Sequence, residues 1–191
     1  MELCEYTITQ CLGEDCGHMP TPGIEQTAWI FNKKDIANLP EDATNKNVIT
    51  DITLNGGATG FQITCVGNPF NGTNAEAVVD DYGTSWTENF VFSVPKGVAQ
   101  SWQIEQIANG KFVVVIETNY EGVDGIAKYQ ILGAKNGLKM SAGSLDPNGD
   151  SKGRYSITLT AEDSPYSAQY LLYNNTLAAT KTRLEELTTC E

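Results

Sequence analysis

Apolar and polar residues alternate in short runs along this chain, and such alternation is typical of β-strands that bury one face. The clearest runs carry the apolar sets Phe61, Ile63 and Cys65; Phe90, Phe92 and Val94; and Tyr155, Ile157 and Leu159. We predict further strands near residues 28–30, 48–54 and 168–173, and one interrupted strand over 127–140. The run KFVVVIETN, residues 111–119, is largely apolar, which predicts a strand buried on both faces if the helix expected over residues 98–109 lies over it.

Two segments follow the helical period instead. Residues 98–109 gather Ile104 and Ile107 on one face, and an Asn-Gly pair marks the end of this helix. Residues 174–191 predict a C-terminal helix that is capped by Thr176 and has leucines along one side. Strands, a helix and again strands predict a mainly β fold, a β-sandwich or curled sheet flanked by one α-helix.

The same patterns divide the chain into three parts. Residues 1–23 hold three of the five cysteines, the only histidine and the breaker MPTPG, so we expect an N-terminal arm. Residues 24–173 form the β-sandwich with its central helix, and residues 174–191 form the C-terminal helix or arm. Within the sandwich, residues 67–86 show no sustained period and predict a long loop. Long loops in compact domains are usually functional or mobile, so an interaction surface is expected there first.

One polar segment looks like the start of a calcium loop, with Asp146, Asn148 and Asp150 at alternate positions. The calcium template requires glycine at its sixth position and glutamate at its twelfth, where this chain has Ser151 and Ile157. It also requires flanking helices, whereas both flanks alternate like strands. The segment DPNGDSKG therefore predicts a polar turn between paired strands.

The net charge and the small number of arginines argue against some functions. The 191 residues carry a net charge of −12, and only two of the twelve basic residues are arginines, Arg154 and Arg183. Specific nucleic-acid binding, which depends on clustered Arg and Lys, is therefore not expected. No apolar run approaches the ~20 residues of a membrane helix, and MELCEYTITQ has no secretory-signal pattern, so we expect synthesis in the cytoplasm and no membrane partner.

Motifs for catalysis are absent from the sequence, which contains neither GxSxG nor GxxxxGK and has a single histidine, so we expect neither an enzyme nor a cofactor. The candidate metal ligands are Cys4, Cys11, Cys16 and His18. Their spacings, with six, four and one intervening residues, differ from those of paired zinc knuckles. The alternatives are an arm folded around zinc and an arm with incidental thiols.

Several stretches resemble a known family. They are GIEQTAWIFNKKDIA, ITDITL, GKFVVVIETNYEGVDGIAKYQILGAKNGLKMSAGSLDPNGDSKGRYSITLTAEDSPY and TLAATKTRLEEL. In this order they resemble major tail tube, or tube-like, structural proteins of phages and prophages from Bacteroides-type bacteria. The first arm and residues 67–86 lie outside the resemblance.

The resemblance implies a virion protein of the phage tail, synthesised in the host cytoplasm. It implies a β-sandwich flanked by one helix, of which six copies form a ring, and rings that stack into a hollow tube next to other tail or connector proteins. DNA would pass through this tube without specific binding, and an acidic lumen would repel its backbone. Ring closure would come from strand edges that add to the neighbouring sheet.

Under this reading the long loop and both termini would make contacts between rings. The inter-subunit contact candidates are the aromatic residues Phe70, Tyr82 and Trp86, because aromatic side chains contribute strongly to interfaces. The alternative is that these side chains only pin the loop to its own domain.

Two other functions stay open. A head-tail connector or tail-terminator ring component would share the fold and the acidity. An extracellular carbohydrate-binding β-sandwich is a different class, in which Trp29, Trp86 and Trp102 would provide platforms for sugar rings.

Overall fold

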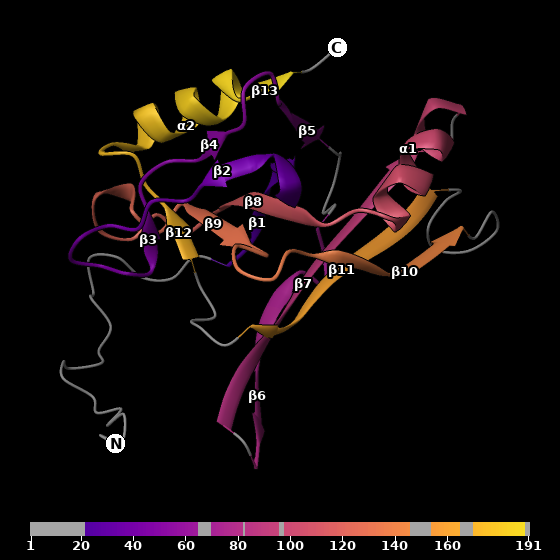
Figure 1. Ribbon diagram of the computed structural model, residues 1–191, viewed down its shortest axis with the longest axis horizontal. Coiled ribbons are helices and arrows are strands. Elements are labelled where there is room, and N and C mark those ends of the chain that lie inside the picture. The colour runs from indigo at the N-terminus through magenta and orange to yellow at the C-terminus, as the bar shows by residue number, and fades with distance from the viewer. Residues whose placement is uncertain are drawn as a thin grey trace.

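A seven-stranded sheet forms the central layer of the protein, as Figure 1 shows. The computed structural model describes residues 22–64, 70–81, 83–95, 98–145, 154–164 and 170–189. The strands of this sheet are β1 (Ile24–Asn32), β3 (Val48–Ile49), β5 (Gly60–Thr64), β8 (Phe112–Thr118), β9 (Tyr129–Leu132), β12 (Tyr170–Leu172) and β13 (Thr188–Thr189). Across the sheet they lie in the order β13-β5-β1-β8-β9-β12-β3.

A second sheet has four strands and is antiparallel throughout. Its strands are β6 (Asn74–Asp80), β7 (Gly83–Pro95), β10 (Lys139–Leu145) and β11 (Arg154–Ser164), in the order β10-β11-β7-β6. The remaining elements are a ribbon of β2 (Ile36–Asn38) and β4 (Thr53–Leu54), the helices α1 (Val98–Ala108) and α2 (Leu177–Glu186), and the 3-10 turns η1 (Lys33–Asp35) and η2 (Val123–Gly125). The predicted mainly β fold is confirmed, and both predicted helices are present.

The two faces of strand β8 pack in two different hydrophobic clusters. Phe112, Val114 and Ile116 belong to a cluster of buried side chains that fills the space between the two sheets. Val113 and Val115 point to the other side and belong to a second cluster, which α2 covers. Because strand side chains alternate, a strand with both faces buried needs an unbroken apolar run. The predicted burial of this strand on both faces is confirmed, but the helix over the second cluster is α2, where the prediction had the helix of residues 98–109.

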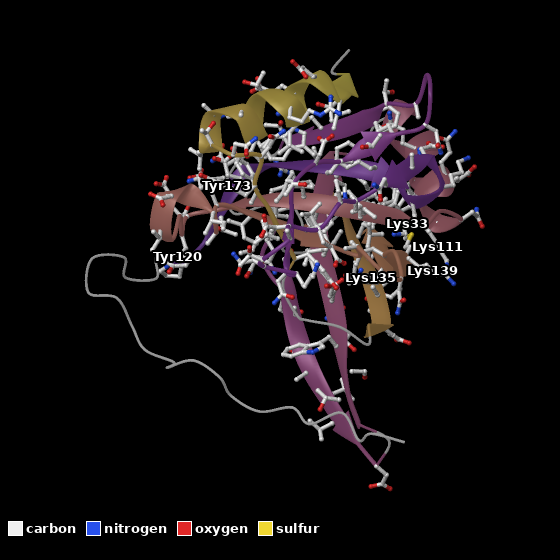
Figure 2. All side chains as sticks on the ribbon, turned by 60° about the vertical axis from the view of Figure 1, so that its left-hand side comes forward. Lys33, Lys111, Tyr120, Lys135, Lys139 and Tyr173 are labelled. Carbon is white, nitrogen blue, oxygen red and sulfur yellow. The ribbon has the colours of Figure 1, made fainter. Side chains whose placement is uncertain are left out.

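The β6–β7 hairpin replaces much of the predicted loop. The prediction of a loop over residues 67–86 is wrong from Asn74 onward, because β6 and β7 pair from Asn74↔Asn89 to Asp80↔Gly83. The hairpin projects away from the body of the protein in two views (Figure 1, Figure 2). A projecting hairpin has solvent on both sides, so its sequence is free of the alternation that buried strands require.

The chain crosses from one sheet to the other between β9 and β10. The prediction of one interrupted strand over 127–140 is wrong, because β9 belongs to the seven-stranded sheet and β10 to the four-stranded sheet. Gly133 and Gly137 have positive φ angles of 74° and 73°. A Cβ atom on Gly133 would lie 2.8 Å from the Phe112 carbonyl oxygen and 2.9 Å from the Leu138 nitrogen. Only glycine fits this tight turn without strain.

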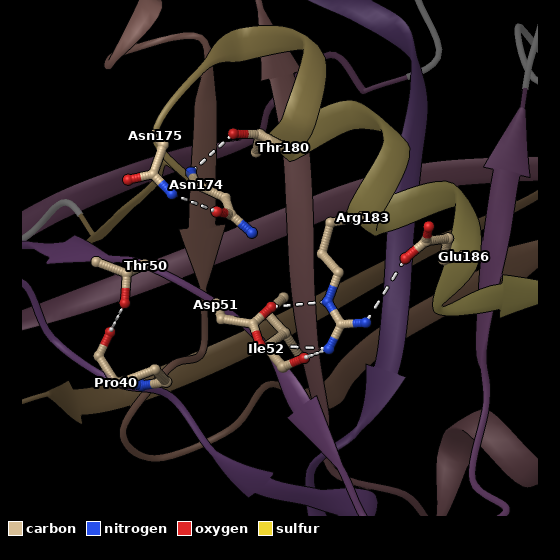
Figure 3. A network of polar contacts seen from close by, with 9 residues as sticks. All are labelled: Pro40, Thr50, Asp51, Ile52, Asn174, Asn175, Thr180, Arg183 and Glu186. Carbon is tan, nitrogen blue, oxygen red and sulfur yellow. Dashed lines mark hydrogen bonds and ion pairs between the residues drawn. The ribbon is translucent and has the colours of Figure 1, made fainter.

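Helix α2 has a capped start, an ion pair and a buried leucine, and Figure 3 shows the ion pair between Arg183 and Asp51. The Thr176 side chain accepts a hydrogen bond of 3.1 Å from a first-turn backbone N–H, which confirms the predicted cap. Arg183 donates to both Asp51 carboxylate oxygens at 2.8 and 3.2 Å. Leu184 is completely buried beneath the helix. The helix is shorter than the predicted 174–191, because the following residues pair with β5 as β13.

Candidate functional site

The four-stranded sheet buries only one of its faces. In β11, Ile157 and Leu159 are buried in the core, whereas Ser156, Thr158 and Thr160 on the opposite side are partly exposed. Strand β7 pairs with β11 in register and repeats this alternation. We call the exposed side the open face; it includes Lys139, Ser141 and Ser144 of β10, Arg154, Ser156, Thr158 and Thr160 of β11, Asn89, Val91 and Ser93 of β7, and Asn74 and Glu76 of β6. Hydroxyl and amide groups therefore dominate this surface.

A ladder of side-chain hydrogen bonds crosses all four strands of the open face. Thr160 Oγ1 donates to Asn89 Oδ1 at 2.8 Å, and Asn89 Nδ2 donates to Asn74 Oδ1 at 2.9 Å. Ser141 Oγ lies 2.7 Å from Thr160 Oγ1, where either hydroxyl can be the donor, and 3.3 Å from the Thr158 carbonyl oxygen, to which it can also donate. At the other end, Asn74 Nδ2 donates to the Glu76 carboxylate at 2.6 Å. The ladder holds the face in one arrangement without a cationic group.

Both outer strands of this sheet are free edges within the part of the chain that the structure describes. Strand β6 pairs only with β7, and β10 pairs only with β11. Each is seven residues long. The seven-stranded sheet differs, because its edge strands β13 and β3 are two residues each. Free edges of this length expose backbone N–H and C=O groups that can pair with another strand.

The far end of the hairpin combines exposed apolar and acidic groups. We call residues 78–81, with the sequence VVDD, the hairpin tip. Val79 is 76% exposed, the largest fraction for a large hydrophobic side chain in the described ranges, and Asp81 is also exposed. Residues 70–94 contain no lysine or arginine. The hairpin is thus acidic, and its tip exposes an apolar side chain.

A cluster of lysines on the body has the opposite charge (Figure 2). We call Lys33, Lys111, Lys135 and Lys139 the lysine patch. The Lys33 backbone N–H donates to the Lys111 carbonyl at 2.8 Å, which sets these two residues side by side. Burial, followed by the charges of Lys135 and Lys111, lowers the pKa of Lys33. Of the described carboxylates, none lies within 4.0 Å of the Lys33, Lys111 or Lys139 ammonium group.

A cavity of about 200 Å³ opens beside the lysine patch. Lys33 and Lys135 line it together with the apolar side chains of Ile36, Leu39 and Ile49. Lys135 is held there by Glu41, whose carboxylate lies 2.8 Å from its ammonium group, and this bond raises the pKa of Lys135. The lining of the cavity is therefore mixed, with polar groups predominating over the exposed surface of these apolar side chains.

Glu88 is the one acidic residue among the buried polar side chains of the described ranges. It is 2% exposed, and its Oε2 accepts a 2.6 Å hydrogen bond from the Gly133 N–H at the crossing between the sheets. Burial raises the pKa of Glu88, and the bond from Gly133 partly opposes that effect. This contact ties β7 to the crossing of the chain, which is a structural role.

The predicted contact residues have different positions in the structure. Phe70 is 1% exposed and packs on Phe90 with ring centroids 5.3 Å apart, so its prediction as an inter-subunit contact is wrong and the pinning alternative holds. Trp86 is partly exposed on β7 opposite Ala77. Tyr82 lies outside the described residues.

The remaining candidate residues from the sequence are the possible metal ligands and two tryptophans. The possible metal ligands Cys4, Cys11, Cys16 and His18 lie outside the described residues. Within the described ranges no group of three or more His, Cys, Asp and Glu side chains could hold a metal, and no helix is long and apolar enough to cross a membrane. Trp29 is buried in the second core and cannot offer its ring to a sugar, and the Trp102 side chain lies outside what the structure describes.

The predicted turn over DPNGDSKG also lies outside the described residues, but its flanks are described. Strands β10 and β11 precede and follow it, and Leu145 pairs with Tyr155. The flanks are therefore paired antiparallel strands, as predicted, and not the helices of a calcium loop.

Sequence reasoning missed the lysine patch and the ladder. The four lysines stand at positions 33, 111, 135 and 139, and only the pairing of β1 with β8 and the crossing after β9 bring them together. Comparison of the chain with known proteins gave no matching family model, no matching curated protein and no matching solved structure.

Proposed function

We propose that this chain is a virion structural protein, a phage tail tube subunit whose copies join into rings that stack around a channel for DNA. The observation that carries the proposal is the four-stranded sheet with two long free edges and one open face. The resemblance stated from the sequence supplies the tube and the six-fold ring; the sheet supplies a physical means of joining copies.

Strand direction favours a head-to-tail joint. In an antiparallel sheet of four strands the two outer strands run in opposite directions, so β6 of one copy can lie beside β10 of the next and continue the alternation. Their equal length of seven residues allows pairing along the whole edge. A joint between two different surfaces closes into a ring when the rotation between copies permits it.

The open face suits the lining of a channel. Its hydroxyl and amide groups are engaged with one another in the ladder, and the ladder ends on the Glu76 carboxylate. A phosphate backbone is bound chiefly by Lys and Arg, and the described residues of the open face include one of each, Lys139 and Arg154, so this surface offers DNA few cationic contacts. The net charge of −12 adds general repulsion of polyanions.

Proline scanning of β10 tests the edge joint. Successive backbone N–H groups of a strand point to opposite sides, so one of Gly143→Pro and Ser144→Pro removes a donor from the free edge. We expect rings or tubes of the unchanged protein in negative-stain microscopy and light scattering, and loss of rings in that variant with an unchanged circular dichroism spectrum. Ser144→Ala keeps the N–H and should keep the rings.

The opposite results are equally clear. A strictly monomeric unchanged protein at high concentration would overturn the proposal. Rings that persist in both proline variants would exclude the β10 edge as the joint. Counting copies per particle separates a tube subunit from a connector or tail-terminator component, which would share the edge joint but occur once per tail.

A further inference from the structure

We infer that the cavity beside the lysine patch is a binding site for a small phosphate-bearing anion, either free phosphate or a small phosphate ester. The anion lies between the ammonium groups of Lys33 and Lys135, with Tyr170 beside it. This site goes beyond the proposed function and does not depend on it, so each of the two can fail without the other.

The lining of the cavity carries donors and cations but no anionic group. Of the nine described residues that line it, none has a carboxylate, and four have side chains that can donate hydrogen bonds: Lys33, Asn38, Lys135 and Tyr170. In the chain as a whole, 24 acidic residues stand against 12 basic ones. A cavity whose charged lining is entirely cationic therefore departs from the composition of the chain, and such a lining raises the local concentration of anions.

Three distant segments bring these groups to the cavity. Lys33 follows β1 in η1, Lys135 lies in the crossing after β9, and Tyr170 begins β12. The Lys33 ammonium group donates to the Ala134 carbonyl oxygen, which places it next to Lys135 in the crossing (Figure 2). The Lys135 ammonium group lies 5.2 Å from the centre of the Tyr170 ring. The two ammonium groups are thus held near one another by contacts within the fold, before any ligand binds.

The charge of Lys33 has no counter-ion among the described side chains. Burial, followed by the charges of Lys135 and Lys111, lowers the pKa of Lys33. None of the described carboxylates lies within 4.0 Å of its ammonium group, whereas Lys135 has Glu41 at 2.8 Å. A phosphate between the two lysines offsets their repulsion, because it can carry two negative charges where Glu41 supplies one.

The size of the cavity indicates a small ligand. Its volume of about 200 Å³ is below the roughly 300–1,000 Å³ of pockets that hold drug-sized molecules. It is several times the roughly 30 Å³ that one water molecule occupies in the liquid. A phosphate group presents several oxygens that accept hydrogen bonds, and lysine binds it as a point charge. Phosphate, alone or with a few attached atoms, therefore fits both the volume and the donors.

Isothermal titration calorimetry with inorganic phosphate tests the site on the full chain, in a buffer without other oxyanions and at constant ionic strength. We expect saturable binding, and an affinity about tenfold or more weaker in Lys33→Gln and in Lys135→Gln. Lys34→Gln is the matched control, because Lys34 is the next residue of η1 and is exposed, but is not among the residues that line the cavity. This control should bind phosphate as the unchanged protein does.

Removal of the Glu41 carboxylate tests the site in the opposite direction. Glu41 competes with the ligand for Lys135, so Glu41→Gln should tighten phosphate binding about threefold or more. Glu41 is exposed, and a loss of folding cannot produce a gain in affinity, so this variant keeps the test decisive if a lysine variant fails to fold. Glu25→Gln is its control, because Glu25 lies near the start of β1, whereas Lys33 follows the end of that strand. Its affinity should be unchanged.

Glycerol phosphate separates the two sources of the ligand. Tighter binding of this ester than of inorganic phosphate indicates a phosphorylated metabolite, and equal or weaker binding indicates free phosphate; both results support the site. Three results overturn it: no saturable binding of phosphate below about 10 mM, equal weakening in Lys34→Gln and Lys33→Gln, or no tightening in Glu41→Gln. Duplex DNA that binds through Lys33 and Lys135 where phosphate does not would also overturn it, in favour of a contact with nucleic acid.

Discussion

The two sheets of this protein differ in what covers them. The seven-stranded sheet has a cluster of buried side chains on each face, and its edges are strands of two residues. The four-stranded sheet has one buried face, one open face and two edges of seven residues. The first sheet has short edges, whereas the second, within the described ranges, has two long edges whose backbone groups are open to pairing with another strand.

This difference separates the residues that stabilise the fold from those that would join copies under the proposed function. Changes to the covered sheet should act on folding, because they remove packing that nothing replaces. Changes to the open face and the edges should leave the monomer folded and act on association. Variants that separate the two effects can therefore test the division of roles.

The largest effect is expected from Leu184→Ala, under helix α2. Leu184 is completely buried against the second core, so the change leaves a cavity and should lower the free energy of unfolding by about 2–5 kcal/mol. Urea denaturation measures it. Val91→Ala on the open face also removes apolar atoms, but from a partly exposed side chain, and should cost less than about 1 kcal/mol. Equal losses in the two variants would contradict the division of roles.

A smaller effect is expected from Gly133→Ala, at the crossing between the sheets. The new Cβ would lie 2.8 Å from the Phe112 carbonyl oxygen in a backbone with φ of 74°, so we expect a loss of about 1–3 kcal/mol by thermal or urea unfolding. Gly57→Ala is the matched control, since Gly57 has φ of 80° but nothing within 4 Å of the added Cβ. Its loss should be about 1 kcal/mol. If Gly57→Ala lowers the free energy of unfolding as much as Gly133→Ala does, crowding around Gly133 has no role.

The smallest effect is expected in the pH dependence of Glu88→Gln. The raised pKa of Glu88 means that the folded protein holds this proton more tightly than the unfolded chain does. The free energy of unfolding therefore falls as pH rises from the ordinary glutamate pKa through the raised one. The glutamine variant should lack this share of the slope at pH values above the ordinary glutamate pKa in urea unfolding. Exposed Glu105→Gln should keep the slope, and a slope unchanged in Glu88→Gln would contradict the assignment.

The strands that could be predicted from the sequence are those with one face in the core and the other face in solvent. Phe90 and Phe92, or Ile157 and Leu159, alternate with polar residues because one side of each strand meets the core and the other meets solvent. The cap at Thr176 was equally readable, because the bond is made within one turn of the chain. Local contacts leave local signals.

The remaining features depend on contacts between distant residues. The hairpin strand β6 was missed because Val78 and Val79 are both exposed, so no alternation is imposed on it. For Phe70 the sequence leaves an inter-subunit contact and a pin to its own domain both open, because the packing of Phe70 on Phe90 in the first core joins residues that are distant in the sequence. The lysine patch leaves no sequence signal, because its members are assembled only by strand pairing and by the crossing at Gly133.

The ladder on the open face has a sense of direction. Thr160 on β11 donates to Asn89 on β7, and Asn89 donates to Asn74 on β6, so both of these bonds run toward β6. Bond dipoles aligned in this way add together and do not cancel. The two edges of the sheet are therefore not equivalent even in an isolated subunit, because the bonds point toward β6 and away from β10. In a ring of subunits joined edge to edge, this direction would be the same at every subunit.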